Sequence, residues 1–154
     1  QEFNFNQFET VLQIVLNQAG YYGVPRNVAH ERAEKYLSQL DLWEKRNARA
    51  RELSGGMKRR LMIARSLMHE PKMLILDEPT EGIQPNVIQL IGNVIQELKD
   101  EGAMSIILVE QYFDWARQLA DAFTVMRRGE VIASLRTDAA SDEQITRLRD
   151  LISI

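Results

Sequence analysis

Hydrophobic residues recur at helical spacing through the first 70 residues of the chain and gather into short uninterrupted runs after them. Intervals of three and four residues between apolar positions predict helices at 8–22, 28–40 and 55–68. We expect Phe8 on the buried face of the first helix and Asn27 as the cap of the second. The first 70 residues are therefore predicted to form a helical part.

The apolar runs at 73–76 and 104–109 resemble buried strands of a parallel sheet, and a predicted helix follows each of them. Asn86 is the expected cap of the first of these helices. Alternating strands and helices predict an α/β domain with a mostly parallel sheet flanked by helices. We expect the boundary between the two parts at residue 70, with the α/β part covering 71–154.

The last third of the chain predicts a hairpin and a closing helix. Two apolar segments, 123–126 and 130–135, flank the turn pair Arg128-Gly129, which is typical of a β-hairpin. Ser141 and Gln144 have the spacing of a capping box for a last helix.

Composition narrows the class of protein without naming a function. The 154 residues are 45% hydrophobic and 27% charged, which is ordinary for a globular protein, and the net charge of −3 gives no reason to expect nucleic acid. The absence of cysteine excludes disulfides and thiolate metal sites. His30 and His69 are isolated, which argues against zinc. We interpret the basic positions of the third helix as a solvated face: Lys58, Arg59, Arg60 and Arg65.

The segment Ser54-Gly55-Gly56 opens the third predicted helix. Glycines at a helix start let backbone N–H groups approach a phosphate without a Cβ in the way, and the helix N-terminus favours negative charge. Ser54 adds a hydroxyl that can donate. An ordinary helix cap is the alternative explanation of these three residues alone.

Two carboxylates end the apolar run at 73–76. A buried strand delivers Asp77 and Glu78 to the carboxyl end of a parallel sheet, where ligands bind. There Asp77 can hold Mg²⁺, and Glu78 can act as general base on an attacking water. A strand running into an acidic loop is the alternative, and Ser54 some twenty residues upstream makes the ligand site the stronger interpretation.

The order of these motifs resembles the signature helix and Walker B segment of ABC transporter ATPase subunits. The resemblance implies ATP and Mg²⁺ as cofactors of the complete ATPase, with Ser54, Gly55 and Gly56 on the nucleotide of an opposite subunit. It places Gln1 at the Q-loop position, near nucleotide and Mg²⁺, and Gln111 at the switch position, in the catalytic machinery. It also implies partners, a second ATPase subunit and a membrane-spanning subunit, and a cytoplasmic position on the inner face of the membrane.

Two groups of the family are represented in the chain. Residues 1–72 resemble multidrug exporter ATPases, whereas 81–154, with Gln111 in place of the family's histidine, resemble branched-chain amino acid and urea importers. We interpret this as a chimera, natural or engineered, with a single divergent subunit as the alternative. The direction of transport therefore stays open.

No glycine of the 154 residues is followed by lysine, so the family's phosphate-binding loop is not among them. We expect the chain alone to bind no cofactor and to lack hydrolytic activity. Three interpretations stay open: part of a transport ATPase, a folding scaffold without activity, or a module that docks on a membrane subunit.

In the family, a phosphate-loop strand lies between the strands that correspond to 104–109 and 123–126. Without it, two apolar strand edges are open to pairing. We expect these strands to close against each other, or two chains to form a homodimer through the edges.

Overall fold

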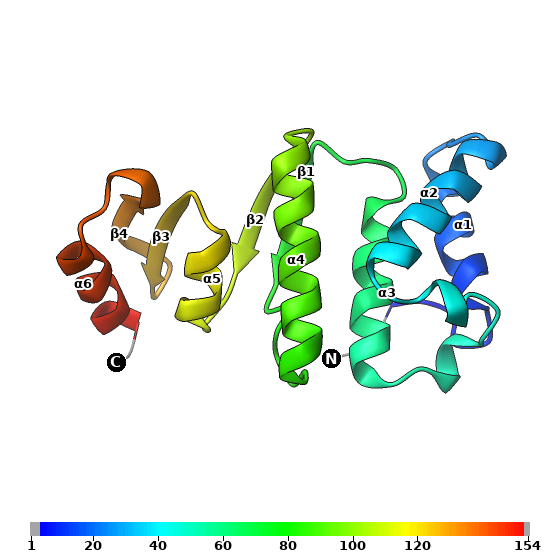
Figure 1. Cartoon of the computed structure of the whole chain (residues 1–154), viewed down its shortest axis with the longest axis horizontal. Coiled ribbons are helices and arrows are strands. Elements are labelled where there is room, and N and C mark those ends of the chain that lie inside the picture. Colours follow the sequence, from blue (N-terminus) through cyan, green and yellow to red (C-terminus); the bar gives the residue numbers. More distant parts are fainter. Residues whose placement is uncertain (1–3, 153–154) are drawn as a thin grey trace.

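The computed structural model describes residues 4–152, in which six α-helices, four strands and three short 3-10 helices follow one another from a helical end to a hairpin end. The helices are α1 (Val11–Tyr21), α2 (Arg26–Gln39), α3 (Gly55–Leu67), α4 (Pro85–Glu101), α5 (Phe113–Leu119) and α6 (Asp142–Ile152). The strands are β1 (Met73–Asp77), β2 (Ser105–Val109), β3 (Ala122–Arg127) and β4 (Glu130–Arg136). Figure 1 shows an elongated molecule with α1–α3 at one end, α4 in the middle and α6 at the other end.

Local chemistry explains where the helices begin. The Thr10 hydroxyl accepts from Gln13 N–H while the Gln13 side chain accepts from Thr10 N–H, so α1 begins after a capping box. Phe8 lies outside the helix with 70% of its surface exposed, so its predicted burial is wrong. The expected caps Asn27 and Asn86 are also wrong, because prolines fix earlier starts: α2 begins directly after Pro25 and α4 at Pro85.

The strands form two separate two-stranded sheets in the described part of the chain. β1 and β2 are parallel, with Met73 opposite Ser105 and Asp77 opposite Val109. β3 and β4 form the predicted antiparallel hairpin through Arg128-Gly129, and Ser141 and Gln144 form the predicted capping box before α6. An α/β fold with a helical N-terminal part is thus confirmed.

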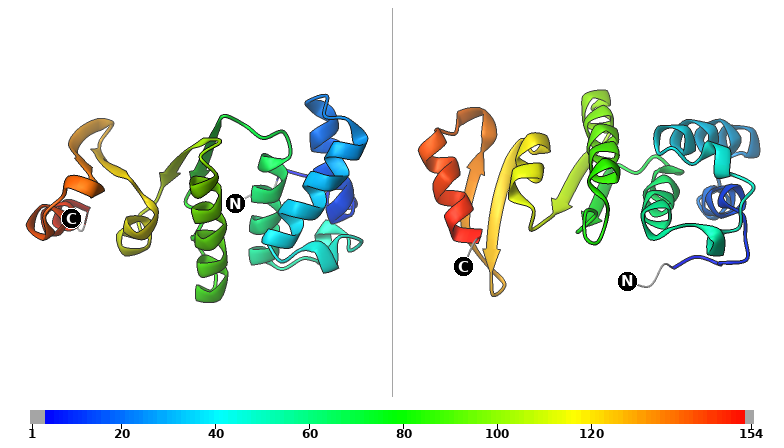
Figure 2. Two further views of the ribbon diagram at one scale, coloured as in Figure 1. Left: turned by 45° about the horizontal axis from the view of Figure 1, so that its top comes forward. Right: turned by 60° about the horizontal axis from the view of Figure 1, so that its bottom comes forward.

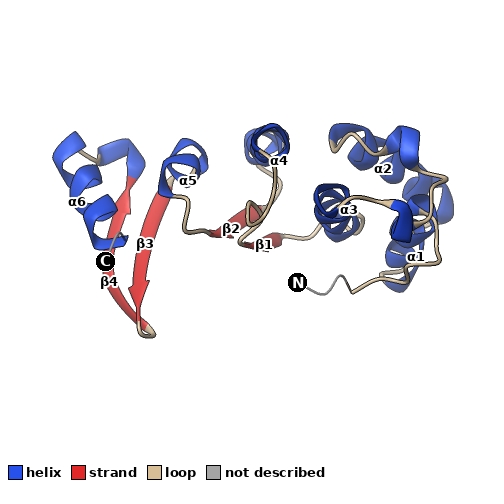
Figure 3. Cartoon of the chain, turned by 90° about the horizontal axis from the view of Figure 1, so that it is seen from below, coloured by secondary structure: helices blue, strands red, loops and turns tan. Residues whose placement is uncertain are grey.

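Only one face of the β1–β2 sheet is covered. Leu74 and Leu76 are buried on the side of α4, whereas Ile75 on the opposite face is 62% exposed. Figure 3 shows α4 on one side of these strands. The expectation of strands buried on both faces is therefore wrong, because no described element covers the second face. The exposed apolar side chains of this open face are Met73, Ile75, Ile107 and Val109.

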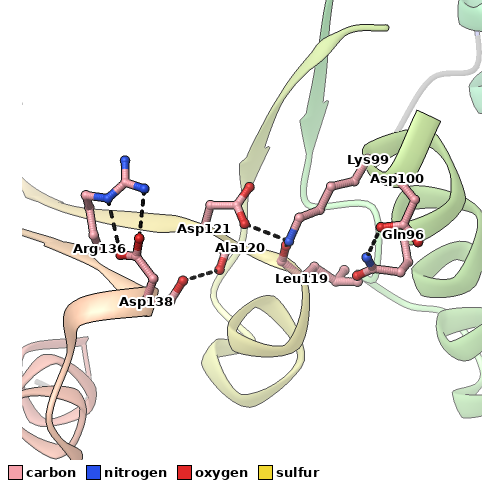
Figure 4. A network of polar contacts seen from close by, with 9 residues as sticks. Gln96, Lys99, Asp100, Leu119, Ala120, Asp121, Arg136 and Asp138 are labelled. Carbon is pink, nitrogen blue, oxygen red and sulfur yellow. Dashed lines mark hydrogen bonds and ion pairs between the residues drawn. The ribbon is translucent and has the colours of Figure 1, made fainter. Parts of the chain in front are cut away.

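β2 and β3 do not pair with each other. The expectation that these two strands close against each other is therefore wrong. Helix α5 occupies the connection and packs against α4. The ammonium of Lys99 donates to Leu119 O at 2.9 Å and pairs with Asp121 at 2.8 Å (Figure 4). Thr137, after β4, donates through its hydroxyl to Ala120 O at 2.9 Å. These contacts fix the start of β3 to the end of α4 rather than to β2.

The helices and strands follow one another along the length of the molecule (Figure 2), and they form two hydrophobic cores in its described part. The larger core joins α1–α3 to β1 and α4 and includes Trp115 of α5. The smaller core lies between the hairpin and α6, around Phe113, Val125 and Leu148. Helix α5 contributes to both, so it links the two ends.

We expect Gly92→Val to lower the free energy of unfolding by about 1–3 kcal/mol through overpacking. A Cβ at Gly92 would lie 3.1 Å from Nε1 of Trp115, whose side chain is buried and cannot move aside. Urea unfolding followed by circular dichroism measures the change. Gly20→Ala in α1 is the matched control, because a Cβ there meets nothing within 4 Å, and it should raise stability by about 0.5–1 kcal/mol. An equal rise in the free energy of unfolding of both variants would contradict the close approach of Gly92 to Trp115.

Arg60 corrects the interpretation of a solvated basic face. Its side chain is buried, and Nη1 donates to Leu40 O at 2.7 Å, to Asp41 O at 3.2 Å and to Asp41 Oδ2 at 3.2 Å. The guanidinium thereby satisfies carbonyls at the C-terminal end of α2, which have no partner within the helix. Arg65 of the same helix donates to Gln18 Oε1 at 2.8 Å. These two arginines thus join α3 by hydrogen bonds to the end of α2 and to α1.

His69 stacks on Tyr22, with ring centroids 3.8 Å apart and planes 7° from parallel. Its Nδ1 is buried and has no hydrogen-bond partner in the described part of the chain. Burial, with a smaller contribution from the nearby Arg32 guanidinium, lowers the pKa of His69 below its ordinary value of 6.5.

We expect stability to fall as the pH is lowered through about 6.5. Because the folded pKa of His69 is the lower one, the unfolded chain takes up a proton that the folded chain does not, which favours unfolding. The free energy of unfolding measured in urea at pH 7.5, 6.5 and 5.5 tests this. His69→Phe keeps an aromatic ring on Tyr22 and should weaken the dependence. An unchanged pH profile in that variant would contradict the assignment to His69.

Within residues 4–152, no helix has both the length and the apolar character needed to cross a bilayer. No cluster of three or more metal-ligating side chains occurs in the same part of the chain.

Candidate functional site

The site lies where the two parallel strands end together. Asp77 is opposite Val109, and the N–H of Glu78 donates to Val109 O at 2.8 Å, so the pairing extends one residue past β1. Glu78 has φ 43°, in the left-handed region that non-glycine residues adopt with strain. This turn takes the chain sharply out of the sheet, as such strained positions do at functional sites.

The structure brings the predicted Glu78 and Gln111 together. Gln111 Nε2 donates to Glu78 Oε1 at 2.5 Å across 33 residues of sequence. The pair lies in a shallow hollow of about 240 Å³, which opens at the carboxyl end of β1 and β2. The hollow is lined by Glu78, Thr80, Glu81, Glu110, Gln111 and Tyr112. A carboxylate held by an amide beside open space can polarise a water molecule.

Sequence reasoning missed two residues of this site, Thr80 and Glu110. Thr80 donates to Glu110 Oε1 through its backbone N–H at 2.9 Å and its hydroxyl at 2.7 Å. Glu110 Oε2 accepts from the N–H groups of Gln111 at 3.2 Å and Tyr112 at 3.4 Å. The sequence did offer a sign of both residues: Glu110 directly precedes the switch glutamine, and Thr80 follows Glu78 by two residues.

The signature residues lie at the start of α3. The Ser54 hydroxyl accepts from Met57 N–H at 3.3 Å, as in the helix-cap interpretation, while Ser54 and Gly55 stay exposed. A Cβ at Gly56 would meet the side chain of Ile83 at 3.3 Å, so this helix start packs on the segment after Thr80. Among residues 4–152, no hydrogen bond joins Ser54 to Glu78 or Gln111. Gln1 lies outside the described residues.

Asp77 fits the expected Mg²⁺ role in its chemistry. Its side chain is exposed at the carboxyl end of β1, next to the hollow. Mg²⁺ keeps several waters and binds proteins through one or two carboxylates together with phosphate oxygens. One exposed aspartate without a protein cage is therefore a suitable donor set for a metal that arrives with a nucleotide.

A second, larger hollow of about 700 Å³ lies in the helical part. Arg65 is at its wall and donates through Nη1 to Asn4 O. The lining combines amide, charged, aromatic and aliphatic side chains: Asn4, Phe5, Asn6, Glu9, Ile14, Asn17, Gln18, Tyr21 and Arg65.

Comparisons with known proteins show which sequences this chain resembles. Residues 1–81 match the family model described as "ABC transporter". The chain is 34% identical over 134 residues to the methionine import ATP-binding protein MetN 1 of Bacillus cereus, covering 87% of this chain and 39% of that protein. It is 36% identical over 133 residues to the glutamine transport ATP-binding protein GlnQ of Geobacillus stearothermophilus, covering 86% of this chain and 54% of that protein.

Solved structures show the same fold. The ADP conformation of MJ1267, an ATP-binding cassette of an ABC transporter, superimposes with a TM-score of 0.75 at 30% identity. That match covers 94% of this chain and 60% of the solved one. The chain thus spans less than two thirds of the relatives that it matches.

Proposed function

Because this chain belongs to the ABC transporter family of ATP-binding proteins, we propose that it supplies the hydrolytic carboxylate and the signature motif of a transport ATPase. The observation that carries the proposal is the contact of 2.5 Å between Gln111 Nε2 and Glu78 Oε1 beside Asp77. The names of the methionine import and glutamine transport relatives support uptake of a small solute as the process that is driven.

In this proposal Glu78 accepts a proton from the attacking water. Gln111 holds the carboxylate in its orientation, and the strand pair keeps both residues at one edge of the sheet. Mg²⁺, when bound with nucleotide at Asp77, neutralises charge on the phosphates. Gln1 belongs to the nucleotide and Mg²⁺ site at Asp77. Ser54 and the N–H groups of Gly55 and Gly56 serve the nucleotide of a second subunit.

The two parts of the chain have different partners in the proposal. Residues 1–70 dock on a membrane-spanning subunit, with the hollow beside Arg65 as the contact, whereas 71–154 carry the hydrolytic residues. This places the protein on the inner, cytoplasmic face of the membrane. A homodimer through the unpaired edges of β2 and β3 is a further proposal, which the division into two sheets supports. The mass in solution, measured by light scattering, tests it.

The phosphate-binding lysine has to come from elsewhere, since no glycine of the 154 residues precedes a lysine. We therefore expect the purified chain to show no hydrolysis by itself and to gain Mg²⁺-dependent hydrolysis with a P-loop-bearing ABC subunit. GlnQ of Geobacillus stearothermophilus, with its own signature serine replaced, is a suitable probe. Turnover that then requires Ser54 of this chain supports the proposal. Turnover unaffected by Ser54→Ala contradicts it and favours a docking module or an inactive scaffold.

A further inference from the structure

The carboxylate of Glu110 is the centre of a hydrogen-bond cluster at the end of β2. Oε1 accepts two hydrogen bonds from Thr80, at 2.9 and 2.7 Å, and Oε2 accepts from Gln111 N–H at 3.2 Å and Tyr112 N–H at 3.4 Å. The two oxygens thus serve two different loops, the one after β1 and the one after β2. Such charge-assisted bonds are about twice as strong as neutral ones.

The two loops need such a link because the sheet no longer joins them. The β1–β2 ladder ends with Asp77 opposite Val109, and Glu78 N–H to Val109 O, at 2.8 Å, is its last bond. Beyond it, Thr80 is only 8% exposed, and its N–H and hydroxyl both donate to Glu110. Loss of that acceptor would leave the two donors of a buried residue unsatisfied.

Glu78 and Gln111 lie immediately beside this link. Thr80 is two residues after Glu78, and Gln111 directly follows Glu110. We propose that Glu110 is a positioning residue, which fixes the Glu78–Gln111 pair by bridging the two loops. The catalytic consequence rests on the proposed function, whereas the positioning itself does not.

The same contacts exclude Glu110 as a second proton acceptor. Both of its oxygens are directed to protein donors, two for each oxygen. Both glutamates line the hollow, but among the described residues the Glu78 carboxylate accepts one hydrogen bond, from Gln111 at Oε1, whereas Glu110 accepts four. The two residues have the same side chain but different hydrogen-bond partners. In the proposal Glu78 therefore accepts the proton, and Glu110 positions the Glu78–Gln111 pair.

The test follows the side-chain amide of Gln111 by ¹⁵N NMR in the full chain. The Gln111 side-chain amide donates to Glu78, whereas Glu110 accepts from the Gln111 backbone N–H, so the side-chain resonance reports positioning rather than a lost direct hydrogen bond. We expect Glu110→Ala to shift the resonance toward that of an exposed glutamine. Hydrogen exchange of the Thr80 and Gln111 backbone amides should accelerate by about tenfold, as expected for loss of a hydrogen bond to a charged group. An unchanged Gln111 side-chain resonance in Glu110→Ala would overturn the inference.

Further variants separate positioning from general destabilisation. Thr80→Val removes the hydroxyl bond alone and should shift the Gln111 resonance in the same direction, whereas Thr80→Ser should restore it. Gly92→Val, which lowers stability in α4, should leave the resonance in place, and a shift in that variant would contradict a specific role for Glu110.

Turnover of a fusion in which the P-loop-bearing part of GlnQ precedes residue 1, so that the P-loop and Glu78 share one nucleotide, distinguishes this inference from the proposed function. Glu110→Ala should lower kcat while leaving the KM for ATP unchanged. If Glu78→Gln itself leaves turnover unchanged, the proposed function fails, and the positioning role is then decided by the Gln111 resonance alone.

Discussion

Glu78→Gln is expected to lower turnover of ATP by about a hundredfold or more, the effect typical of losing a general base. Glutamine keeps the side-chain length and an oxygen that can still accept the bond from Gln111 Nε2. It cannot take a proton from water, so the geometry stays and the chemistry is lost. The measurement is steady-state phosphate release from a fusion in which the P-loop-bearing part of GlnQ precedes residue 1, so that the P-loop and Glu78 act on the same nucleotide. Nucleotide binding is followed separately by calorimetry.

Binding of Mg²⁺-ATP should persist in this variant, because Asp77 and Ser54 are untouched. Glu143→Gln is the matched control, since it makes the same charge change on exposed α6 at the hairpin end of the molecule. Turnover within about twofold of wild type in Glu78→Gln would rule out Glu78 as the base.

Arg60→Met is expected to lower the free energy of unfolding by about 2–4 kcal/mol. Methionine fills similar volume but cannot donate, so Leu40 O and Asp41 O lose the Nη1 bonds of 2.7 and 3.2 Å. The buried acceptor, Leu40 O, costs about 1–3 kcal/mol when it is left unsatisfied, and the part-buried Asp41 O adds less. The ion pair with Asp41 contributes little of this, because the Asp41 side chain is 83% exposed.

Asp41→Asn separates the two effects. Asparagine tolerates the positive φ of 53° at this position and removes only the charge, so we expect a loss of less than about 1 kcal/mol. Urea unfolding of both variants, with midpoints and slopes compared, gives the difference. Equal losses in Arg60→Met and Asp41→Asn would mean that the ion pair, and not the capping of α2, holds α3 in place.

Periodicity predicted the elements better than their ends. Apolar spacing, together with turn and cap signals, placed the six α-helices and four strands of residues 4–152, because the core-facing stripes of α1–α4 are read directly from sequence. Cap predictions failed at Asn27 and Asn86, where a nearby proline dictates the start. The burial of the strands could not be predicted, since it depends on which elements cover each face of the sheet.

At the candidate site, too, part could be predicted from the sequence and part could not. Glu78 could be predicted from the apolar strand that ends in two carboxylates, and Gln111 from the family resemblance, and the structure places them in contact. Thr80 and Glu110 could not, because what a carboxylate binds depends on how two loops 30 residues apart approach each other. Arg60 was misread for a related reason: a basic residue among other basic residues gives no sign in sequence that carbonyls of another helix lie within its reach.

The open face of the β1–β2 sheet affects how stability varies with temperature. Side chains such as Ile75 and Val109 are already about half or more exposed in the folded chain, so their hydration changes less on unfolding than that of buried side chains. The heat-capacity increment of unfolding comes mainly from newly hydrated apolar surface, and it is therefore smaller than for a fully covered sheet. A smaller increment flattens the stability curve, so this molecule loses less of its stability on cooling than a closed domain of the same length does.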